Sequence, residues 1–161
     1  MRRFSKHISV SLGVVAAVVI CILVFGDSMP KRKCYNQLRS IGCAIMLYRG
    51  DHDGAYPSDL VSIENGMYLP LLQCPGAKKV ASNQRINGAD YVYVNWSPHL
   101  PNTKVLPDDY PIVYDSRLSN HNGRGINILL VGGSVIWDEN AKWLSAFVVS
   151  NYPWMSLPSS K

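Results

Sequence analysis

The sequence predicts an α+β protein in which a long N-terminal helix packs on a small antiparallel sheet. Three observations lead to this prediction. A long apolar run near the N-terminus is followed by a segment with helical spacing of its apolar residues, and short strand-like segments separated by turn residues make up most of the remainder. With 161 residues, the chain is long enough for a membrane segment and one modest soluble core.

Residues 1–7 form a basic leader, and residues 8–26 form an apolar run without a charged side chain. A helix needs about 20 apolar residues to cross a hydrocarbon core about 30 Å thick, so the run predicts a membrane-spanning helix with the lipid bilayer as partner. A removable secretion signal is the alternative, because Gly26 and Ser28 are small residues suited to cleavage. The apolar region of such a signal is usually about 7 to 15 residues long, which favours a retained anchor.

The net charge of +5 comes largely from the leader and from residues 31–39, on the two sides of the apolar run. Basic side chains at these places would face anionic lipid headgroups. The positive charge on the two sides is nearly equal, so it does not select an orientation in the membrane. The rest of the chain has no basic stripe interleaved with aromatic residues, which argues against nucleic acid as a partner.

Residues 27–50 are predicted to form an amphipathic helix that leads into the soluble part. Pro30 would either occupy an early position of a new helix or kink one long helix that continues from the membrane. The apolar residues recur at alternating steps of four and three: Cys34, Leu38, Ile41, Ile45 and Tyr48. The helix is expected to end where breakers follow, at Gly50, Gly54 and Pro57.

Residues 51–150 are predicted to form the antiparallel-sheet head, and residues 151–161 a flexible tail. The nearly continuous apolar character of residues 128–131 indicates a strand that is central or covered on both faces. A short helix is predicted after the last strand, because Trp143, Leu144, Phe147 and Val148 repeat at helical spacing. The strand candidates are residues 90–96, 110–115, 126–131 and 134–137.

Three segments resemble bacterial type IV pilin-like proteins, particularly the pseudopilins of type II secretion. CYNQLRSIGCAIMLYRGDHDGAYPSDL at 34–60 is similar to the segment after the membrane helix, and LLQCP at 71–75 is similar to the Cys-Pro segment of one large branch. HNGRGINILLVGGSVIW at 121–137 resembles the C-terminal mark of that branch, a histidine followed by an Asp-Gly hairpin. The residues in the corresponding places are His121, Asn127, Ile128, Leu129 and Trp137.

The resemblance implies a pilin-like fold and a non-enzymatic pilin-like or pseudopilin-like subunit of a type II secretion or type IV pilus-like assembly. Such a subunit is a single-pass protein of the bacterial inner membrane with its soluble domain in the periplasm. Its partners would be copies of itself or other pilin-like subunits, held through the N-terminal helix. The alternative is a membrane-tethered or secreted binding module with the same fold and no role in secretion.

Two departures from the family pattern bear on this choice. The chain has Gly13 but no Phe-Thr-Leu-Ile-Glu at the junction of leader and helix and no glutamate in the apolar run, which favours the alternative. Gly132 stands where the family mostly has aspartate, and Ser134 where histidine is common. Asp-Gly and Gly-Gly both accept the positive φ of a type I′ turn. A type I′ turn is therefore expected at Gly132 and Gly133.

No catalytic residue is predicted. His121 lies in a polar turn with no identified nucleophile or acidic orienter, and VGGSV around Ser134 is not Gly-x-Ser-x-Gly. His121, Asn127 and Trp137 are therefore given structural roles in the hairpin. Asp51 and Asp53 are candidate calcium ligands, but calcium needs about six to eight oxygen ligands, which favours a structural turn. No other cofactor is indicated.

The cysteines allow several interpretations. Cys34 and Cys74 are a candidate disulfide, which would tie the helix to the following loop if the domain lies outside the cytoplasm. Cys43 is the competing partner, and buried free thiols are the third interpretation. The chain contains no Cys-x-x-Cys pair, which argues against a structural zinc centre.

Overall fold

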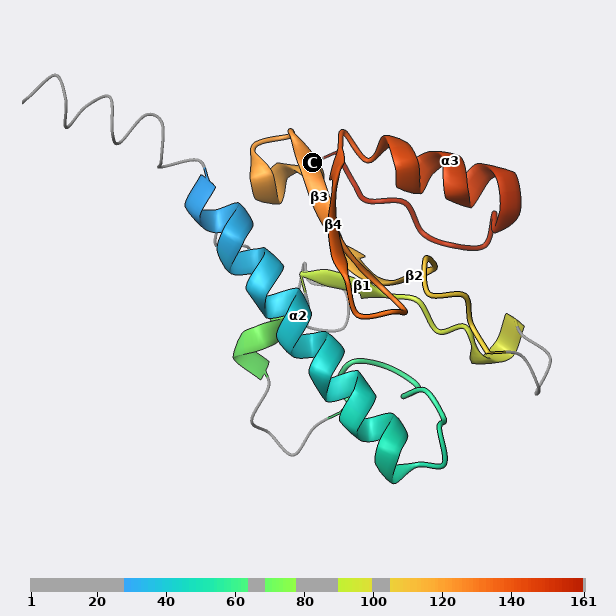
Figure 1. Ribbon diagram of the computed structural model, residues 1–161. Coiled ribbons are helices and arrows are strands. Elements are labelled where there is room, and N and C mark those ends of the chain that lie inside the picture. The colour runs from blue at the N-terminus through green and yellow to red at the C-terminus, as the bar shows by residue number, and fades with distance from the viewer. Residues whose placement is uncertain (1–27, 64–68, 78–89, 100–104, 161) are drawn as a thin grey trace, which may run out of the picture.

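The computed structural model describes residues 28–63, 69–77, 90–99 and 105–160 (Figure 1). The predicted leader and apolar run, residues 1–26, lie outside the described residues. Within the described part of the chain, no helix has both the length and the apolar character needed to span a bilayer.

The described elements confirm an α+β fold with a small antiparallel sheet of four strands and two α-helices. Neighbouring strands pair antiparallel in the order β1-β2-β3-β4, so the sheet is a meander. The elements follow one another as α2 (Ser28–Asp51), η1 (Leu69–Leu72), β1 (Tyr91–Tyr93), η3 (Ser97–His99), β2 (Pro111–Asp115), η4 (Leu118–His121), β3 (Gly125–Leu130), β4 (Val135–Glu139) and α3 (Lys142–Asn151), where η is a 3-10 helix.

The helix α2 covers nearly the same residues as the predicted amphipathic helix. Four residues of its apolar stripe are buried, and the fifth, Tyr48, is half-buried: Cys34, Leu38, Ile41 and Ile45 lie against the sheet. At Gly42 the helix comes so close to the sheet that an added Cβ would lie 3.2 Å from Cδ1 of Leu129. The glycine therefore permits the close packing of α2 on β3.

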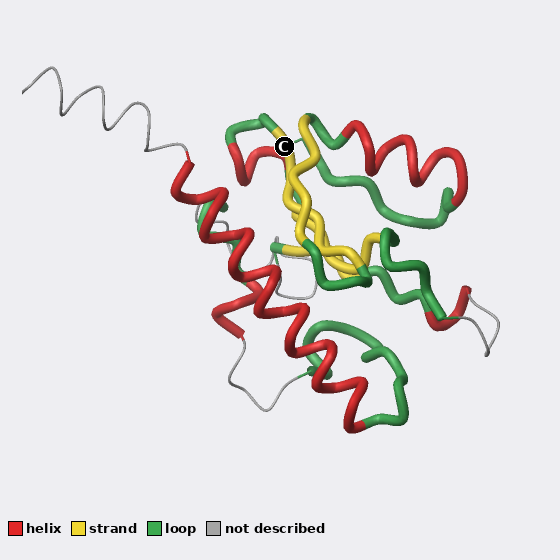
Figure 2. Tube along the Cα trace, in the orientation of Figure 1, coloured by secondary structure: helices red, strands yellow, loops and turns green. Residues whose placement is uncertain are grey.

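The two helices cover opposite faces of the sheet, as Figures 1 and 2 show. Leu129 of β3 belongs to the apolar cluster under α2, whereas Ile128 and Leu130 belong to the cluster under α3. Alternate residues of a strand point to opposite faces, so β3 contributes to both cores. All six residues of β3 are buried. The prediction of a strand covered on both faces is confirmed.

The type I′ turn predicted between the last two strands is wrong. Gly133 has a φ of +84°, but Gly132 does not have positive φ. The N–H of Gly133 donates to the carbonyl of Leu130 at 2.9 Å, and the N–H of Leu130 donates to Ser134 O at 2.8 Å. A turn with ordinary φ at its central residues, closed by one glycine in the left-handed region, therefore connects β3 to β4, which is the pattern of the longer hairpin loops.

The described part of the segment 151–161, predicted to be a flexible tail, lies against the α3 face of the sheet. Met155 is buried in that core, and the hydroxyl of Tyr114 donates to the carbonyl of Ser156. The backbone of Ser159 is joined by hydrogen bonds of 2.9 and 3.0 Å to Ser116, which follows β2, and to Leu118, which begins η4. These contacts connect the end of the chain to the sheet.

Candidate functional site

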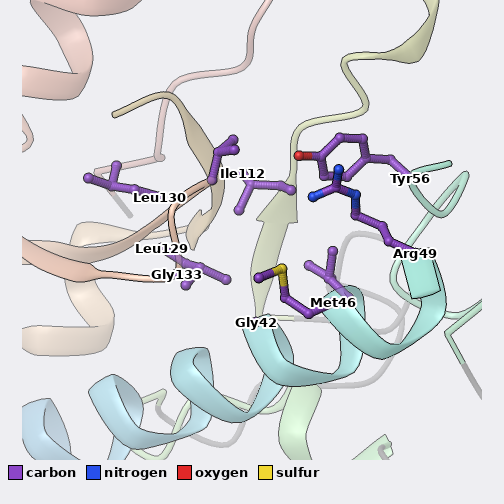
Figure 3. Close-up of a pocket in the computed structure, with 10 residues that line it drawn as sticks. Gly42, Met46, Arg49, Tyr56, Ile112, Leu129, Leu130 and Gly133 are labelled. Carbon is purple, nitrogen blue, oxygen red and sulfur yellow. The ribbon is translucent and has the colours of Figure 1, made fainter. Parts of the chain in front are cut away.

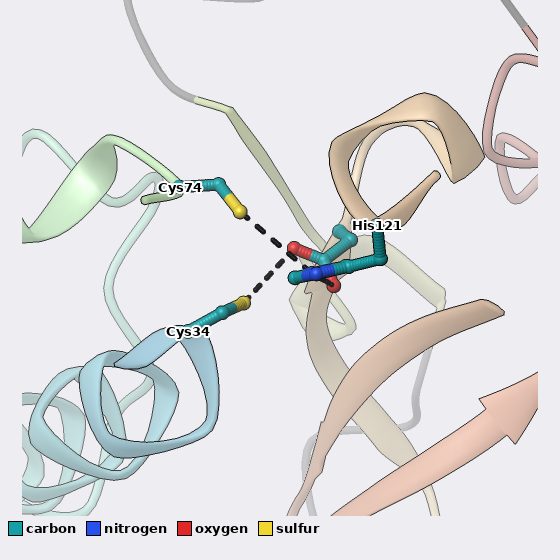
Figure 4. A group of neighbouring side chains, drawn as sticks. Cys34, Cys74 and His121 are labelled. Carbon is teal, nitrogen blue, oxygen red and sulfur yellow. Dashed lines mark hydrogen bonds and ion pairs between the residues drawn. The ribbon is translucent and has the colours of Figure 1, made fainter. Parts of the chain in front are cut away.

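Four side chains from separate segments converge in the interior of the protein. Cys34 comes from α2, Cys74 from the loop after η1, Asp115 from the end of β2 and His121 from the end of η4. All four are buried, and one potential ligand atom from each lies within 4.8 Å of the other three. We call these four residues the buried cluster; Figure 4 shows how the side chains of Cys34, Cys74 and His121 point toward one another.

Asp115 is at the centre of the cluster. Its Oδ1 lies 3.2 Å from Cys34 Sγ, and its Oδ2 lies 3.0 Å from His121 Nε2. The backbone N–H of Asn127 in β3 donates to Oδ2 at 2.7 Å. The carboxylate therefore connects β2 to α2, η4 and β3.

His121 is positioned by a tight turn before β3. Asn122, which follows it, has a φ of 57°, and this left-handed residue ends η4. His121 Nε2 lies 3.7 Å from Cys74 Sγ, and the imidazole meets the indole of Trp137 edge to face with 5.6 Å between ring centroids. Its other nitrogen, Nδ1, is buried and makes no hydrogen bond within the described residues.

Cys74 is held by a loop that packs closely on the turn containing His121. The backbone N–H of Cys74 donates to Oδ2 of the buried Asp90 at 3.1 Å. An added Cβ at Gly76 would lie 2.1 Å from the carbonyl oxygen of Asn120, so any larger side chain would force the loop away. The loop reaches the cluster because residue 76 is glycine.

Tyr91 of β1 closes the side of the cluster next to Cys34. Its hydroxyl lies 3.5 Å from Cys34 Sγ and 3.0 Å from Oε1 of Gln37, and its single proton can be donated to one of the two at a time. Burial raises the pKa of Tyr91, so the hydroxyl remains a neutral donor. It can donate to the sulfur in either protonation state of the cysteine.

The neighbours of His121 and Cys74 favour a protonated imidazole and a deprotonated thiol inside the cluster. Burial lowers the pKa of His121, but hydrogen bonds to Asp115 and Cys74 outweigh it and raise that pKa to about 9. The hydrogen bond with Cys34 and that with His121 lower the pKa of Cys74 to about 7, against the effect of burial. Burial raises the pKa of Cys34. Cys74 is therefore the more readily deprotonated thiol of the two.

The candidate disulfide residues, Cys34 and Cys74, are brought together in this cluster with both thiols free. Cys43, the competing partner, is exposed on α2. The candidate calcium ligands, Asp51 and Asp53, are exposed at the end of α2, and neither belongs to the one group of three or more potential metal ligands within the described residues.

The residues assigned to the predicted hairpin are divided between the buried cluster, its surroundings and the β3–β4 turn. His121 belongs to the cluster, Asn127 donates to Asp115, and Trp137 packs on His121. Gly132 and Gly133 lie in the β3–β4 turn. Asp115 is the site residue that sequence reasoning missed. It ends a short strand candidate without any neighbouring Cys or His, and only strand pairing and the turn at η4 bring it to the others.

A second concavity lies between the C-terminal part of α2 and the sheet (Figure 3). Of the ten residues that line it, Arg49 and Tyr56 are ionisable, and the guanidinium of Arg49 lies 4.2 Å from the centre of the Tyr56 ring. The other lining residues are aliphatic, glycine or methionine. The cation and the aromatic ring of this concavity contact each other, and its other lining residues have no polar side chain. The buried cluster is therefore the stronger candidate site.

Comparison of the chain with protein-family models, curated proteins and solved structures finds no match.

Proposed function

We propose that this chain is a non-enzymatic, membrane-anchored pilin-like subunit whose apolar N-terminal run holds the α+β head at the surface of a bacterial inner membrane. One observation carries the proposal. The three segments that resemble pilin-like proteins are far apart in the sequence, but each contributes one residue to the buried cluster: Cys34, Cys74 and His121. Motifs that occur together by chance have no reason to meet in space.

The packing of α2 supports a role in which the helix carries the head. Leu38 and the rest of the buried stripe fix one side of α2 on the sheet. The opposite side exposes a large apolar residue, Leu47, at 66%. The first side joins the helix to its own head, and the second is available to a neighbouring helix.

The burial of the cluster supports a structural role over a catalytic one. Cys34 is 0%, Cys74 4% and His121 7% exposed. A catalytic group has to reach the reacting atoms of a substrate. Side chains this deep within the described part of the chain are in position to hold α2 and the sheet together.

The second candidate function is a membrane-tethered or secreted binding module that does not assemble. The sequence favours it in one respect, since the apolar run has neither the processing pentapeptide nor a glutamate. The two functions differ in what surrounds α2 in the native membrane. A subunit of an assembly packs against other N-terminal helices, whereas a tether leaves this side of α2 to solvent or to an unrelated ligand.

Photocrosslinking in native membranes tests the proposal. A photoreactive amino acid at Leu47 is expected to crosslink the chain to a second copy or to another protein with an apolar N-terminal helix. The control position is Val149, which is 74% exposed on α3 and belongs to the opposite side of the sheet. Crosslinks from Val149 alone, or a monomer from both positions, would contradict assembly through α2. The intact mass of the mature chain adds a second readout, since pilin processing shortens and methylates the N-terminus.

A further inference from the structure

We propose that the buried cluster binds one Zn²⁺ ion, with Cys34 Sγ, Cys74 Sγ, an Asp115 carboxylate oxygen and His121 Nε2 as its four ligands. The ion would join α2 to the loop after η1, the end of β2 and the end of η4. This role goes beyond membrane anchoring and does not depend on assembly of the chain.

The geometry fits a tetrahedral centre. Zinc bonds of about 2.3 Å to sulfur and about 2.0 to 2.2 Å to nitrogen or oxygen place neighbouring ligand atoms about 3.3 to 3.8 Å apart. The Cys34 Sγ to Asp115 Oδ1 distance is 3.2 Å, and the Cys74 Sγ to His121 Nε2 distance is 3.7 Å. Asp115 Oδ2 and His121 Nε2 are 3.0 Å apart. One ligand atom from each residue lies within 4.8 Å of the other three, so the widest pair has to close by up to about 1 Å around an ion.

The ligand types select the metal. Two thiolates and one imidazole suit Zn²⁺, whereas Ca²⁺ and Mg²⁺ take oxygen ligands. Binding deprotonates both thiols and leaves His121 neutral with its lone pair at Nε2, so protons go to solvent as the metal enters. The ion with two thiolates and one carboxylate then has a formal charge of −1. The cation compensates charges that would otherwise be buried next to one another.

Surrounding groups hold the ligands in place, as they do around zinc in proteins. The backbone N–H of Asn127 donates to Asp115 at 2.7 Å. The hydroxyl of Tyr91 lies 3.5 Å from Cys34 Sγ. The backbone of Cys74 donates to Asp90 at 3.1 Å. The side-chain Nδ2 of Asn127 lies 3.3 Å from His121 Nε2. Each of the four ligands thus has a contact from outside the cluster.

The competing state of this cluster is a Cys34–Cys74 disulfide. A disulfide would join the two sulfurs and would not involve the Asp115 carboxylate or the His121 imidazole. In the structure, each sulfur has one of these polar groups beside it, at 3.2 and 3.7 Å, and both thiols are free. Because all four side chains point to one centre, the arrangement favours a cation over a bond between two of them.

The test measures metal in the full-length chain, purified in mild detergent without chelators or added thiol oxidants. Elemental analysis is expected to find one zinc per chain. Replacement by Co²⁺ is expected to give the visible bands of tetrahedral cobalt with thiolate-to-metal charge transfer. Cys74→Ser and His121→Ala should lose the metal, whereas Cys43→Ser, which changes an exposed cysteine of the same helix, should retain it.

The wild-type chain decides the question even if the cluster variants do not fold. A chain without zinc that contains a Cys34–Cys74 disulfide, identified by peptide mapping and by the loss of two hydrogens in the intact mass, would overturn the proposal. A folded chain with both thiols free that gains no stoichiometric zinc or cobalt on titration would overturn it as well. Neither result bears on membrane anchoring, which is tested separately by fractionation and crosslinking.

Discussion

The carboxylate of Asp115 contacts His121 and the backbone of Asn127 at the same oxygen: Oδ2 lies 3.0 Å from His121 Nε2 and 2.7 Å from Asn127 N. Asp115 ends β2, His121 ends η4, and Asn127 is in β3. One side chain therefore fixes the path of the chain from β2 through η4 into β3. The position of the histidine follows from this path, and so does the convergence of the three segments that carry Cys34, Cys74 and His121.

Asp115→Ala should destabilise the head by about 3 to 5 kcal/mol, because it removes a buried charge partner and leaves the groups around it unpaired. Chemical unfolding of the full-length chain in mild detergent and metal-free buffer measures the difference from wild type. Asp109→Ala is the matched control, since Asp109 is exposed, and it should unfold like wild type. Equal unfolding midpoints for the two variants would show that the Asp115 carboxylate does not organise this region.

Leu38→Ala should lower the free energy of unfolding by about 2 to 5 kcal/mol, the usual effect of truncating a fully buried leucine. Leu38 is 0% exposed on the side of α2 that faces the sheet, whereas Leu47 is 66% exposed on the same helix. Leu47→Ala should change stability by less than about 0.5 kcal/mol. Denaturant unfolding of both variants measures how firmly α2 is docked, and a similar loss for both would contradict the described face.

Asp138→Ala should destabilise α3 by about 1 to 3 kcal/mol, because the buried carboxylate caps the helix. Its two oxygens accept the backbone N–H groups of Trp143 and Leu144 at 3.0 and 2.8 Å. Hydrogen exchange is the direct measurement, and these two amides should exchange faster in the variant. Glu139→Ala, at an exposed neighbouring position, is the control and should leave both amides protected. Unchanged exchange in Asp138→Ala would exclude the cap.

Gly76→Ala should destabilise the loop that carries Cys74 by about 1 to 3 kcal/mol, the usual range for forcing extra atoms into a packed site. Its Cβ would lie 2.1 Å from the backbone carbonyl oxygen of Asn120, which cannot move without shifting η4. Gly50→Ala is the control, because nothing lies within 4 Å of a Cβ there and alanine favours helix by about 1 kcal/mol. Thermal unfolding should therefore move in opposite directions for the two variants, and a stabilised Gly76→Ala would refute the close approach.

Much of the fold could be predicted because each element has a periodic signal of its own. The stripe from Cys34 to Tyr48 has helical spacing, and α2 occupies that segment. The apolar run at 128–131 indicated a strand covered on both faces, and β3 is buried at every position. The turn at Gly132 and Gly133 was predicted wrongly, since a Gly-Gly pair permits several loops and the contact of Gly132 with Asp108 is a tertiary effect.

The candidate site was predicted only in pieces, because no local signal relates its residues. Cys34 and Cys74 are separated by the remainder of α2 and the segment after it, and neither has a second cysteine at zinc-finger spacing. Asp115 was not distinguished from other strand-end carboxylates. What unites them is strand register, in which Tyr91 pairs with Asp115 and so places the carboxylate beside α2. Register is set by packing and turn geometry together, so it cannot be predicted from the spacing of residues within one short segment.

Membrane fractionation of the full-length chain tests the anchored head most directly. Wild type should stay with the membrane through an alkaline wash and dissolve only in detergent. Val15→Arg with Val18→Arg should release it, because each charge in the middle of the apolar run opposes insertion by about 2.5 to 3.5 kcal/mol. Val105→Arg with Val149→Arg is the matched control at positions 89% and 74% exposed, and it should remain bound. Recovery of the uncut wild-type chain in the soluble fraction without detergent would contradict the anchor.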